Sequence, residues 1–249
     1  GNHNLKAMVG YRIEKYNYKY TKAYRKGFPN NDMTDINAGT QSTQTNEGYS
    51  RELAMMSYFG RVNYDYAGKY LFEANFRADA SSRFSPDNRW GYFPSLSAGW
   101  RMSEEAFLND VDWLDNLKLR VSYGEVGNDG INSSLWSQNW EATSDKRYQG
   151  AVNGAFLPSY SLGADMANKD LKWETTSQYN VGVDMGFFQN RINLTIDLYY
   201  KKTSDLLQNI QIPQSTGFSN MTTNFGNVTN KGLEITGKFY AITGKNLNW

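Results

Sequence analysis

The sequence predicts an all-β fold, an antiparallel transmembrane β-barrel, from three observations. Apolar and polar residues alternate with a period of two over segments of roughly 10 to 16 residues, whereas soluble strands usually have about 5 or 6. Short and long connections between these segments alternate along the chain. Aromatic residues make up 15% of the 249 residues, with eighteen tyrosines, thirteen phenylalanines and seven tryptophans.

The composition is polar, yet it is compatible with a barrel. Hydrophobic residues make up 39% of the chain, and the mean hydropathy is -0.69. No run of about 18 apolar residues occurs, so the sequence contains no segment suited to a transmembrane helix. A membrane strand needs an apolar side chain only at every second position, because the barrel interior is wet. The mean hydropathy therefore does not argue against a barrel.

The alternation defines the strands one by one. In the clearest segment, Tyr70, Phe72 and Phe76 share one face of the strand. Glu73 and Arg77 share the other face. About nine strands follow in this way. The predicted segments are Leu5–Glu14, Tyr58–Tyr66, Tyr70–Asp79, Trp90–Arg101, Leu117–Tyr123, Trp173–Phe187, Ile192–Lys201, Leu233–Ala241 and a last one that begins at Asn246.

The connections separate a barrel from a soluble β-sandwich, in which alternation also occurs. Short turns are expected at Ala67–Lys69, Gln189–Asn190 and Gly244–Lys245, with a medium connection at Met102–Asp115. Long connections are expected at Lys19–Arg51, Ser81–Arg89, Gly127–Asp170 and Ser204–Phe225. This alternation is typical of short periplasmic turns and longer extracellular loops. A Greek-key sandwich does not produce it.

Aromatic residues gather where strands meet connections. Those beside short or medium turns are Tyr64, Tyr66, Trp100, Phe187 and Phe188, and those beside long loops are Trp90, Tyr92 and Trp173. Tyrosine and tryptophan combine an apolar ring with a polar tip, which suits a membrane–water interface. They can also be ordinary strand residues, but their clustering at both ends of an aliphatic band favours two interfacial belts.

Several functional classes find no support in the composition. The formal charge of +1 gives no basic footprint for nucleic acid. Cysteine is absent and His3 is the single histidine, so neither a metal site, nor a cofactor site, nor a catalytic constellation is predicted. The chain starts at Gly1 without a methionine and ends at Trp249 within an expected strand. It therefore reads as a fragment at both ends.

Long segments of the chain resemble the barrel of SusC/RagA-type TonB-dependent outer-membrane transporters. The similar segments are Gly60–Arg101, Ser103–Phe107, Leu117–Asn128, Leu171–Asp184 and Asn227–Ile235. They follow one another in order over nearly the whole chain. The resemblance identifies residues 1–249 as part of such a barrel, about nine strands out of about 22.

The resemblance also implies a function. Such transporters lie in the outer membrane of Bacteroidota and import oligosaccharides, peptides or similar nutrients. An N-terminal plug fills the barrel, a TonB box links it to the inner-membrane TonB complex, and a SusD-like surface lipoprotein caps the mouth. The plug, the TonB box and the remaining strands are not found in this sequence. The expected partners are therefore that lipoprotein, the TonB complex through the plug region, outer-membrane lipid and the nutrient itself, and not nucleic acid.

Two groups of residues are candidates for function. The long loop carries Trp136, Trp140, Tyr148 and Phe156, whose rings could bind a sugar or peptide. Loop packing or contact with the lipoprotein is the alternative for these four. The second group is expected to face the lumen and to pair with the plug or with one another, and consists of Arg61, Glu73, Arg77 and Asp79.

Three functions fit parts of this pattern. The first is active import, and the second is a structural or docking barrel that anchors a larger surface complex. The third is a secreted carbohydrate-binding β-protein or enzyme, which the strand lengths and the alternating loops disfavour. The first two share this barrel, so the sequence alone does not separate them. The identity of the nutrient is not encoded in any motif of the chain.

Overall fold

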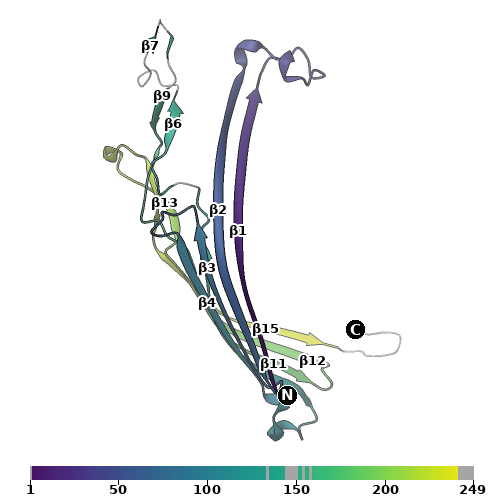
Figure 1. The fold of residues 1–249 in the computed structure, drawn as a ribbon. Helices are drawn as coiled ribbons and strands as arrows, with labels where there is room; N and C mark the ends of the chain where they lie inside the picture. The colour runs from purple at the N-terminus through teal and green to yellow at the C-terminus, as the bar shows by residue number, and fades with distance from the viewer. Residues whose placement is uncertain (1, 133–134, 144–150, 153–154, 157–158, 241–249) are drawn as a thin grey trace.

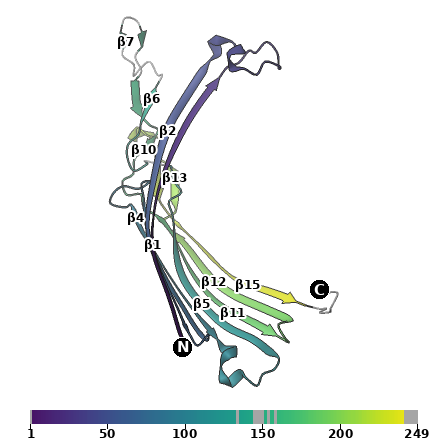
Figure 2. The ribbon, with the colours of Figure 1, turned by 45° about the vertical axis from the view of Figure 1, so that its right-hand side comes forward.

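The computed structural model describes residues 2–132, 135–143, 151–152, 155–156 and 159–240. Eight long antiparallel strands form one sheet in the order β1-β2-β3-β4-β5-β11-β12-β15 (Figure 1). Their bounds are β1 His3–Tyr24, β2 Thr45–Tyr66, β3 Tyr70–Ser81, β4 Trp90–Arg101, β5 Leu114–Asn128, β11 Glu174–Phe187, β12 Ile192–Ser204 and β15 Asn227–Phe239. The sheet curves strongly between its two edges, β1 and β15, as Figure 2 shows.

The predicted all-β antiparallel sheet of long strands is confirmed, and eight of the nine expected strands are present. The ninth, expected from Asn246, lies outside the described residues, as does the turn at Gly244–Lys245. One expectation is wrong: Lys19–Arg51 is not all loop. Strand β1 continues to Tyr24 and β2 begins at Thr45, so each strand has 22 residues. The two strands remain paired through this region, but the apolar side chains move from one face of the strands to the other. The sequence alternation therefore looks interrupted although the strands continue.

The register aligns the apolar positions of all eight strands. Directly paired residues point to the same side of a sheet. One row crosses the sheet through Leu5, Tyr64, Phe72, Ala98, Val121, Val181, Leu198 and Leu233. We call this side the outward face. Its larger side chains are open to the surroundings, with Phe72 51% and Leu198 55% exposed. Contiguous exposed apolar surface of this extent is what a lipid-facing barrel wall requires.

The opposite side, the inward face, is polar. The next row through the sheet runs through Asn63, Glu73, Ser97, Ser122, Asn180 and Tyr199. Amide, hydroxyl and carboxylate groups therefore line this side from β2 to β12. Such groups need water or partners of their own. The two faces give the sheet the polarity of a barrel wall, with lipid on one side and a wet interior on the other.

At the short-turn end, the connections 67–69 and 188–191 are tight, and 102–113 is longer. The turn Ala67–Lys69 follows β2 with positive φ angles at Ala67 and Gly68, as a two-residue hairpin turn of the primed type requires. Asp65 holds this turn by accepting a hydrogen bond from the Gly68 amide at 2.7 Å. Residues 102–113 contain the 3-10 helices Met102–Glu104 and Ala106–Leu108. Among the described residues, no helix is long and apolar enough to cross a membrane.

The connections at the other end are long and carry their own short strands. Strands β6 (Trp140–Thr143) and β9 (Ser159–Leu162) form one hairpin, and β7 (Ala151–Val152) and β8 (Ala155–Phe156) form another. A third small sheet contains β10 (Asp165–Met166), β14 (Asn220–Asn224) and β13 (Leu207–Gln211). Three further 3-10 helices are Ile36–Ala38, Gln41–Thr43 and Gln214–Thr216. The alternation of short turns and long loops predicted from the sequence is present.

Candidate functional site

The inward face carries the predicted Glu73 cluster. The Arg61 guanidinium lies 2.5 Å from the Glu73 carboxylate, and Asn63 and Asn75 donate hydrogen bonds to the same carboxylate at 2.6 and 2.8 Å. Asn75 also reaches the Ser95 hydroxyl on β4. Strands β2 and β3 bring these residues together because their inward positions are paired in register. Arg61 and Glu73 therefore lie on one face of the sheet and contact each other.

The predicted pair Arg77 and Asp79 lies nearer the long-loop end of β3. Arg77 Nε is 2.6 Å from Asp79 Oδ2, and its Nη2 donates to Ser57 Oγ at 2.9 Å. The Asp79 side chain is 9% exposed, whereas Arg77 is 41% exposed. The arginine thus covers a buried carboxylate and leaves its own far edge in the lumen. Its guanidinium also lies 5.8 Å from the ring centre of Phe59.

A third cluster, not among the sequence candidates, joins β5, β11 and β12. Arg120 binds Asp184 through two bonds of 2.7 and 3.0 Å, and its Nη2 also reaches Asp197 at 3.0 Å. Thr195 donates a further bond to Asp184. The register places Arg120 opposite Gly182, which leaves room for the guanidinium. The sequence contains a signal for this cluster, because Arg120, Asp184 and Asp197 all occupy inward positions in the alternating pattern of their strands.

Two hollows lie along the inward face. One of about 620 Å³ lies over β1 to β5 and includes Lys6, Asn63, Glu73 and Lys118 in its lining. The second, of about 550 Å³, lies over β5 to β15 and includes Asp197, Lys201 and Glu234. Both share Arg120 and Ser122. Together they form a continuous trough of charged and neutral polar groups along the inner wall.

A core at the long-loop end closes over the ends of the strands. Phe84, Phe93, Leu171 and Trp173 are buried against one another. The indole of Trp173 donates a hydrogen bond to the Arg89 carbonyl at 2.9 Å. The expectation that Trp173 lies in an interfacial belt is therefore wrong, and β11 begins one residue later. Its ring packs on Phe84 of the loop 82–89 and on Phe93 of β4, contacts that the pattern of a single strand does not reveal.

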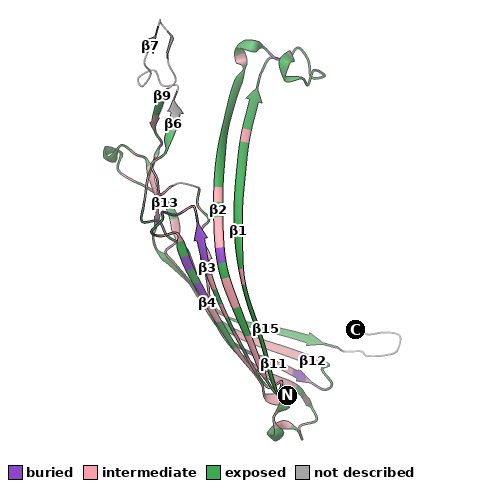
Figure 3. Ribbon diagram, viewed as in Figure 1, coloured by how far each residue is buried: buried purple, intermediate pink, exposed green. Residues whose placement is uncertain are grey.

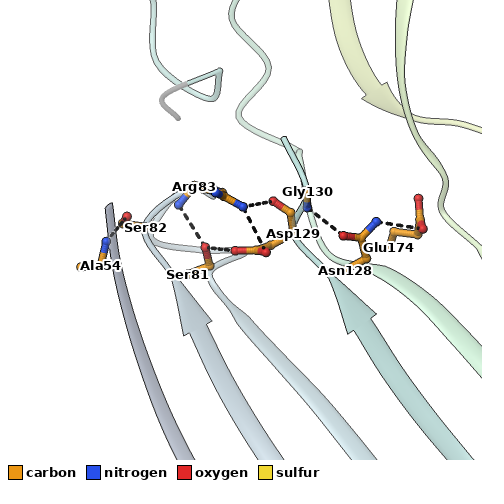
Figure 4. A network of polar contacts seen from close by, with 8 residues as sticks. All are labelled: Ala54, Ser81, Ser82, Arg83, Asn128, Asp129, Gly130 and Glu174. Carbon is orange, nitrogen blue, oxygen red and sulfur yellow. Dashed lines mark hydrogen bonds and ion pairs between the residues drawn. The ribbon is translucent and has the colours of Figure 1, made fainter. Parts of the chain in front are cut away.

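Polar contacts extend this core across three connections. Ser81 and Arg83 both bind the Asp129 carboxylate, at 2.7 and 3.2 Å (Figure 4). Asn128 joins this region to Glu174 at the start of β11, as the same view shows. The Ser82 hydroxyl accepts a hydrogen bond from the Ala54 amide of β2. The loop 82–89 is thus fixed between β2 and β5, which makes Arg83 a structural residue of the rim.

The described members of the substrate-loop candidates lie on separate elements. Trp136 is half-buried, and its indole N–H has no hydrogen-bond partner among the described residues. Its neighbour Leu135 packs on the Phe84 core. Trp140 begins β6 and is 65% exposed, and Phe156 belongs to β8. Tyr148 lies outside the described residues. The structure thus gives Trp136 a packing environment and leaves Trp140 open.

At the short-turn end, Glu105 fixes two connections. Its carboxylate accepts hydrogen bonds from Tyr70 at 2.7 Å and Trp100 at 3.1 Å, and it pairs with Lys69 at 3.2 Å. The hydrogen bond from Tyr70, followed by those from Trp100 and Lys69, lowers the pKa of Glu105 below its usual range. Trp100, which was expected in a belt, is therefore anchored together with Tyr70 to one carboxylate. Among the described residues, no three acidic or histidine side chains are grouped to hold a metal.

Comparison with known proteins identifies the sheet. The model of the family described as TonB-dependent receptor-like β-barrel matches residues 1–249. The chain belongs to this family. It is 42% identical to the TonB-dependent receptor SusC of Bacteroides thetaiotaomicron over 176 residues, which are 70% of this chain and 17% of SusC. A TonB-dependent receptor of Formosa agariphila is 35% identical over 88% of this chain and 20% of its own length.

A solved structure shows the same arrangement. The RagAB peptide importer in its closed-closed state superimposes with a TM-score of 0.84 at 28% identity, over 98% of this chain and 26% of that chain. The SusC/RagA resemblance is therefore confirmed, as are the partial antiparallel barrel and the outer-membrane location. The family comprises receptors and transporters rather than enzymes. The chain spans about a fifth of the length of the curated relatives it matches.

Proposed function

We propose that the complete receptor imports an oligosaccharide, a peptide or a similar nutrient across the outer membrane. The TonB complex supplies the energy through a plug region, and a SusD-like surface lipoprotein caps the mouth. Family membership supports TonB-dependent import in general. The relatives support the finer statement only through their own names, a SusC receptor and a RagAB peptide importer.

The trough on the inward face carries this proposal. An anchor for a surface complex needs an apolar outward face but has no use for a charged lumen wall. Here the wall carries Arg61 with Glu73, Arg77 with Asp79, and Arg120 with two aspartates. Water in a barrel interior solvates such groups, and a polar path suits a polar nutrient. The docking function therefore remains the second candidate, without an observation that favours it.

The internal pairing of the wall bears on plug movement. A barrel wall that depended on the plug to pair its charges would lose those ion pairs whenever the plug moved. Arg61, Glu73, Arg77 and Asp79 each have a partner on the wall itself. If these four residues also contact the plug, those contacts are added to the ion pairs within the wall and can be broken without leaving a charge unpaired. This arrangement suits a plug that must be displaced during every cycle.

Trp136, Trp140, Tyr148 and Phe156 are assigned to early substrate contact or to the lipoprotein interface. Exposed aromatic side chains on the long-loop side suit either task, since both need flat apolar area with nearby polar groups. Trp140 is the best member to test, because its ring is open rather than packed.

The test uses the full-length receptor in its own host. Cells lacking the chromosomal gene are complemented with the wild-type gene, and uptake of labelled oligosaccharides and peptides is measured with and without a functional TonB protein. Import predicts uptake that requires both genes. A complemented strain that takes up nothing beyond the deletion strain, while the receptor still co-purifies with a surface lipoprotein, would replace import by the docking function. Trp140→Ala separates the loop assignment, since import predicts a raised half-saturation concentration with unchanged receptor abundance.

A further inference from the structure

A shallow hollow interrupts the outward face in the middle of the sheet. Its volume is about 500 Å³, and its lining comes from β3, β4, β5 and β11, each of which has a paired strand on both sides. Ala74 and Ala98 contribute only methyl groups, whereas the larger side chains Phe72, Leu96 and Tyr179 are each more than half exposed. Figure 3 shows that the long-loop end of β3 is buried while the middle of the sheet is largely exposed or half-buried.

The hollow is part of the wall that faces lipid. Four residues in its lining, Glu73, Ser97, Ser122 and Asn180, hold inward positions of the register, so the side chains that reach the hollow from the outward face are apolar or tyrosines. Apolar surface within the membrane is covered by hydrocarbon, because water there would lack hydrogen-bond partners. The occupant that fits the hollow is therefore an acyl chain.

The apolar band ends at different rows on different strands. On β12 the outward residues are apolar up to Tyr200, and the next outward residue is Lys202. The same row of paired residues reaches β3 at Ala74, beyond which Phe76 and Ala78 continue the band. Barrel strands tilt by about 35–45°, so a row of paired residues slopes through the membrane. A chain that follows the hollow from β11 to β3, about 14 Å, therefore descends from the membrane boundary into the hydrocarbon.

Three tyrosines mark this boundary at the upper end of the hollow. Tyr123, Tyr179 and Tyr200, which we call the tyrosine row, follow one another across β5, β11 and β12, with ring centres 4.8 and 6.3 Å apart. The Tyr123 hydroxyl donates a hydrogen bond to Glu125 at 2.6 Å, whereas the other two hydroxyls have no partner among the described residues. Rings in the apolar band with hydroxyls left open suit the headgroup region of a bilayer.

Lys202 lies one outward position beyond the tyrosine row. Its side chain is exposed and makes no ion pair with a described residue, although β11 and β15 flank its strand on both sides. The paired neighbours on the same face are Ser177 and Thr229, which carry hydroxyls rather than carboxylates. Tyr179 is a diagonal neighbour, about 7–8 Å away between Cα atoms. The ammonium is therefore within reach of a group that lies at the upper end of the hollow.

The charges at this end favour an anion. At and beyond the tyrosine row, the charged outward residues of β5, β11, β12 and β15 are Glu125, Lys202 and Lys231. The Glu125 carboxylate already accepts hydrogen bonds from Tyr123 at 2.6 Å and Ser177 at 3.2 Å. Two ammonium groups against one engaged carboxylate leave a net positive charge. Lysine binds phosphate as a point charge, and basic residues at a membrane surface attract anionic headgroups.

From these features we propose that the hollow and Lys202 together bind one anionic, phosphate-bearing lipid. An acyl chain of this lipid lies in the hollow across β11, β5, β4 and β3. The phosphate accepts hydrogen bonds from the Lys202 ammonium and the Tyr179 hydroxyl. Because the long connections mark the extracellular side, the lipid belongs to the outer leaflet. The site does not depend on which nutrient the receptor imports.

Native mass spectrometry of the purified full-length receptor tests the site. The receptor is placed in nanodiscs of phosphatidylcholine mixed equally with phosphatidylglycerol or with monophosphoryl lipid A, and the lipids that it retains on release are identified. We expect the wild type to retain one anionic lipid in preference to phosphatidylcholine. Lys202→Gln keeps a polar side chain without the charge and should lower this preference about fivefold. Ala98→Trp fills the hollow and should abolish retention of either anionic lipid.

Two matched controls separate the site from general effects. Lys201→Gln removes the neighbouring charge of β12, whose side chain faces the lumen, and Ile196→Trp adds the same ring to the outward face outside the hollow. Both variants should retain the lipid as the wild type does. Heat-modifiable migration in gels reports the folded barrel for every variant. Where Ala98→Trp fails to fold, Val121→Phe narrows the same hollow and takes its place.

Distinct results would overturn the two parts of the proposal. Equal retention of phosphatidylcholine and the anionic lipids, or a preference that Lys202→Gln leaves unchanged or that Lys201→Gln lowers equally, would reject the phosphate site. Retention that persists when the hollow is filled, or that Ile196→Trp also abolishes, would reject the acyl-chain site. A receptor dimer without retained lipid that dissociates in Ala98→Trp would make the hollow an interface between two copies instead.

Discussion

The two halves of the β1–β2 hairpin share one ladder but have opposite polarity. In the membrane half, residues 3–14 and 55–66, the outward face carries Leu5, Val9, Ile13 and Val62, and the inward face carries Lys6, Arg12, Arg61 and Asn63. In the outer half, residues 15–24 and 45–54, the outward face is polar and the inward face holds Tyr16, Tyr18, Tyr20 and Tyr49. The polarity changes between Glu14 and Lys15, with no break in the register.

The comparison shows that alternation reports the surroundings of each face rather than the strand itself. Backbone pairing is identical on both sides of Glu14, so hydrogen bonding does not distinguish the halves. What differs is the medium that each face meets. A wall between lipid and water needs apolar residues outward, whereas a ribbon in water is free to place its rings wherever they bind something. The inversion therefore marks the outer edge of the membrane on β1 and β2.

A charge on the outward face gives the largest expected difference between the halves. Val62→Arg places a guanidinium near the middle of the membrane half, where such substitutions cost about 2–4 kcal/mol. Ser50→Arg makes the same change on the same face and strand of the outer half, where water solvates it. Urea unfolding of the full-length receptor from lipid vesicles should show the loss for Val62→Arg and no measurable change for Ser50→Arg. Equal effects would remove the membrane boundary from this position.

Ion pairs on the inward face should show the same contrast on a smaller scale. Asp79→Ala leaves Arg77 with Ser57 as its remaining polar partner on the wall and should destabilise the receptor by about 1–2 kcal/mol, a value reduced because Arg77 is partly exposed. Glu47→Ala breaks the pair with Lys22 in the outer half, where both side chains are more than half exposed. The same vesicle assay should detect no change there. A larger loss for Glu47→Ala than for Asp79→Ala would contradict the assignment of the halves.

The sequence predicted what depends on local periodicity. Strand positions, the face of each residue and the order of short and long connections follow from side chains that alternate within one strand. The contacts of Arg61 with Glu73 and of Arg77 with Asp79 followed because both members lie on an aligned face. The sequence failed where the medium changed along one strand. The residues from Lys19 to Arg51 looked like a loop because their apolar positions moved to the other face.

Contacts between residues far apart in the sequence could not be predicted from the alternation within single strands. Trp173 packs on Phe84 and Phe93, and its environment depends on how the loops after β3 and β5 fold back on each other. Arg120 meets Asp184 and Asp197 only because two ladders bring β5, β11 and β12 into one register. The alternating pattern fixes the face of each residue, but which residues lie opposite one another also depends on the geometry of turns and loops. Positions on a face were therefore predictable, and partners across three strands were not.

The smallest effect on stability is expected at the short-turn end of the membrane half. There the Glu105 carboxylate contacts Lys69, Tyr70 and Trp100. The pKa of Glu105 is lowered in the folded receptor by these partners, the Tyr70 hydroxyl first. Their contribution is complete above the pKa of an unfolded glutamate, about 4.3, and is lost as the pH falls through the lower folded value. Hydrogen exchange of the two turns, corrected for its intrinsic pH dependence, should therefore accelerate only in acid.

Glu105→Gln tests this assignment directly. The amide keeps an acceptor for Tyr70 or Trp100 but has no charge for Lys69 and no proton to gain, so the acid-dependent acceleration should disappear while exchange near neutral pH becomes modestly faster. The outer half provides the internal control, because exchange there should be the same in both proteins at every pH. An acid transition that survives in Glu105→Gln would assign it to another carboxylate. The turn end would then depend on that other carboxylate, and the contacts of Glu105 with Lys69, Tyr70 and Trp100 would contribute little to the stability of this boundary.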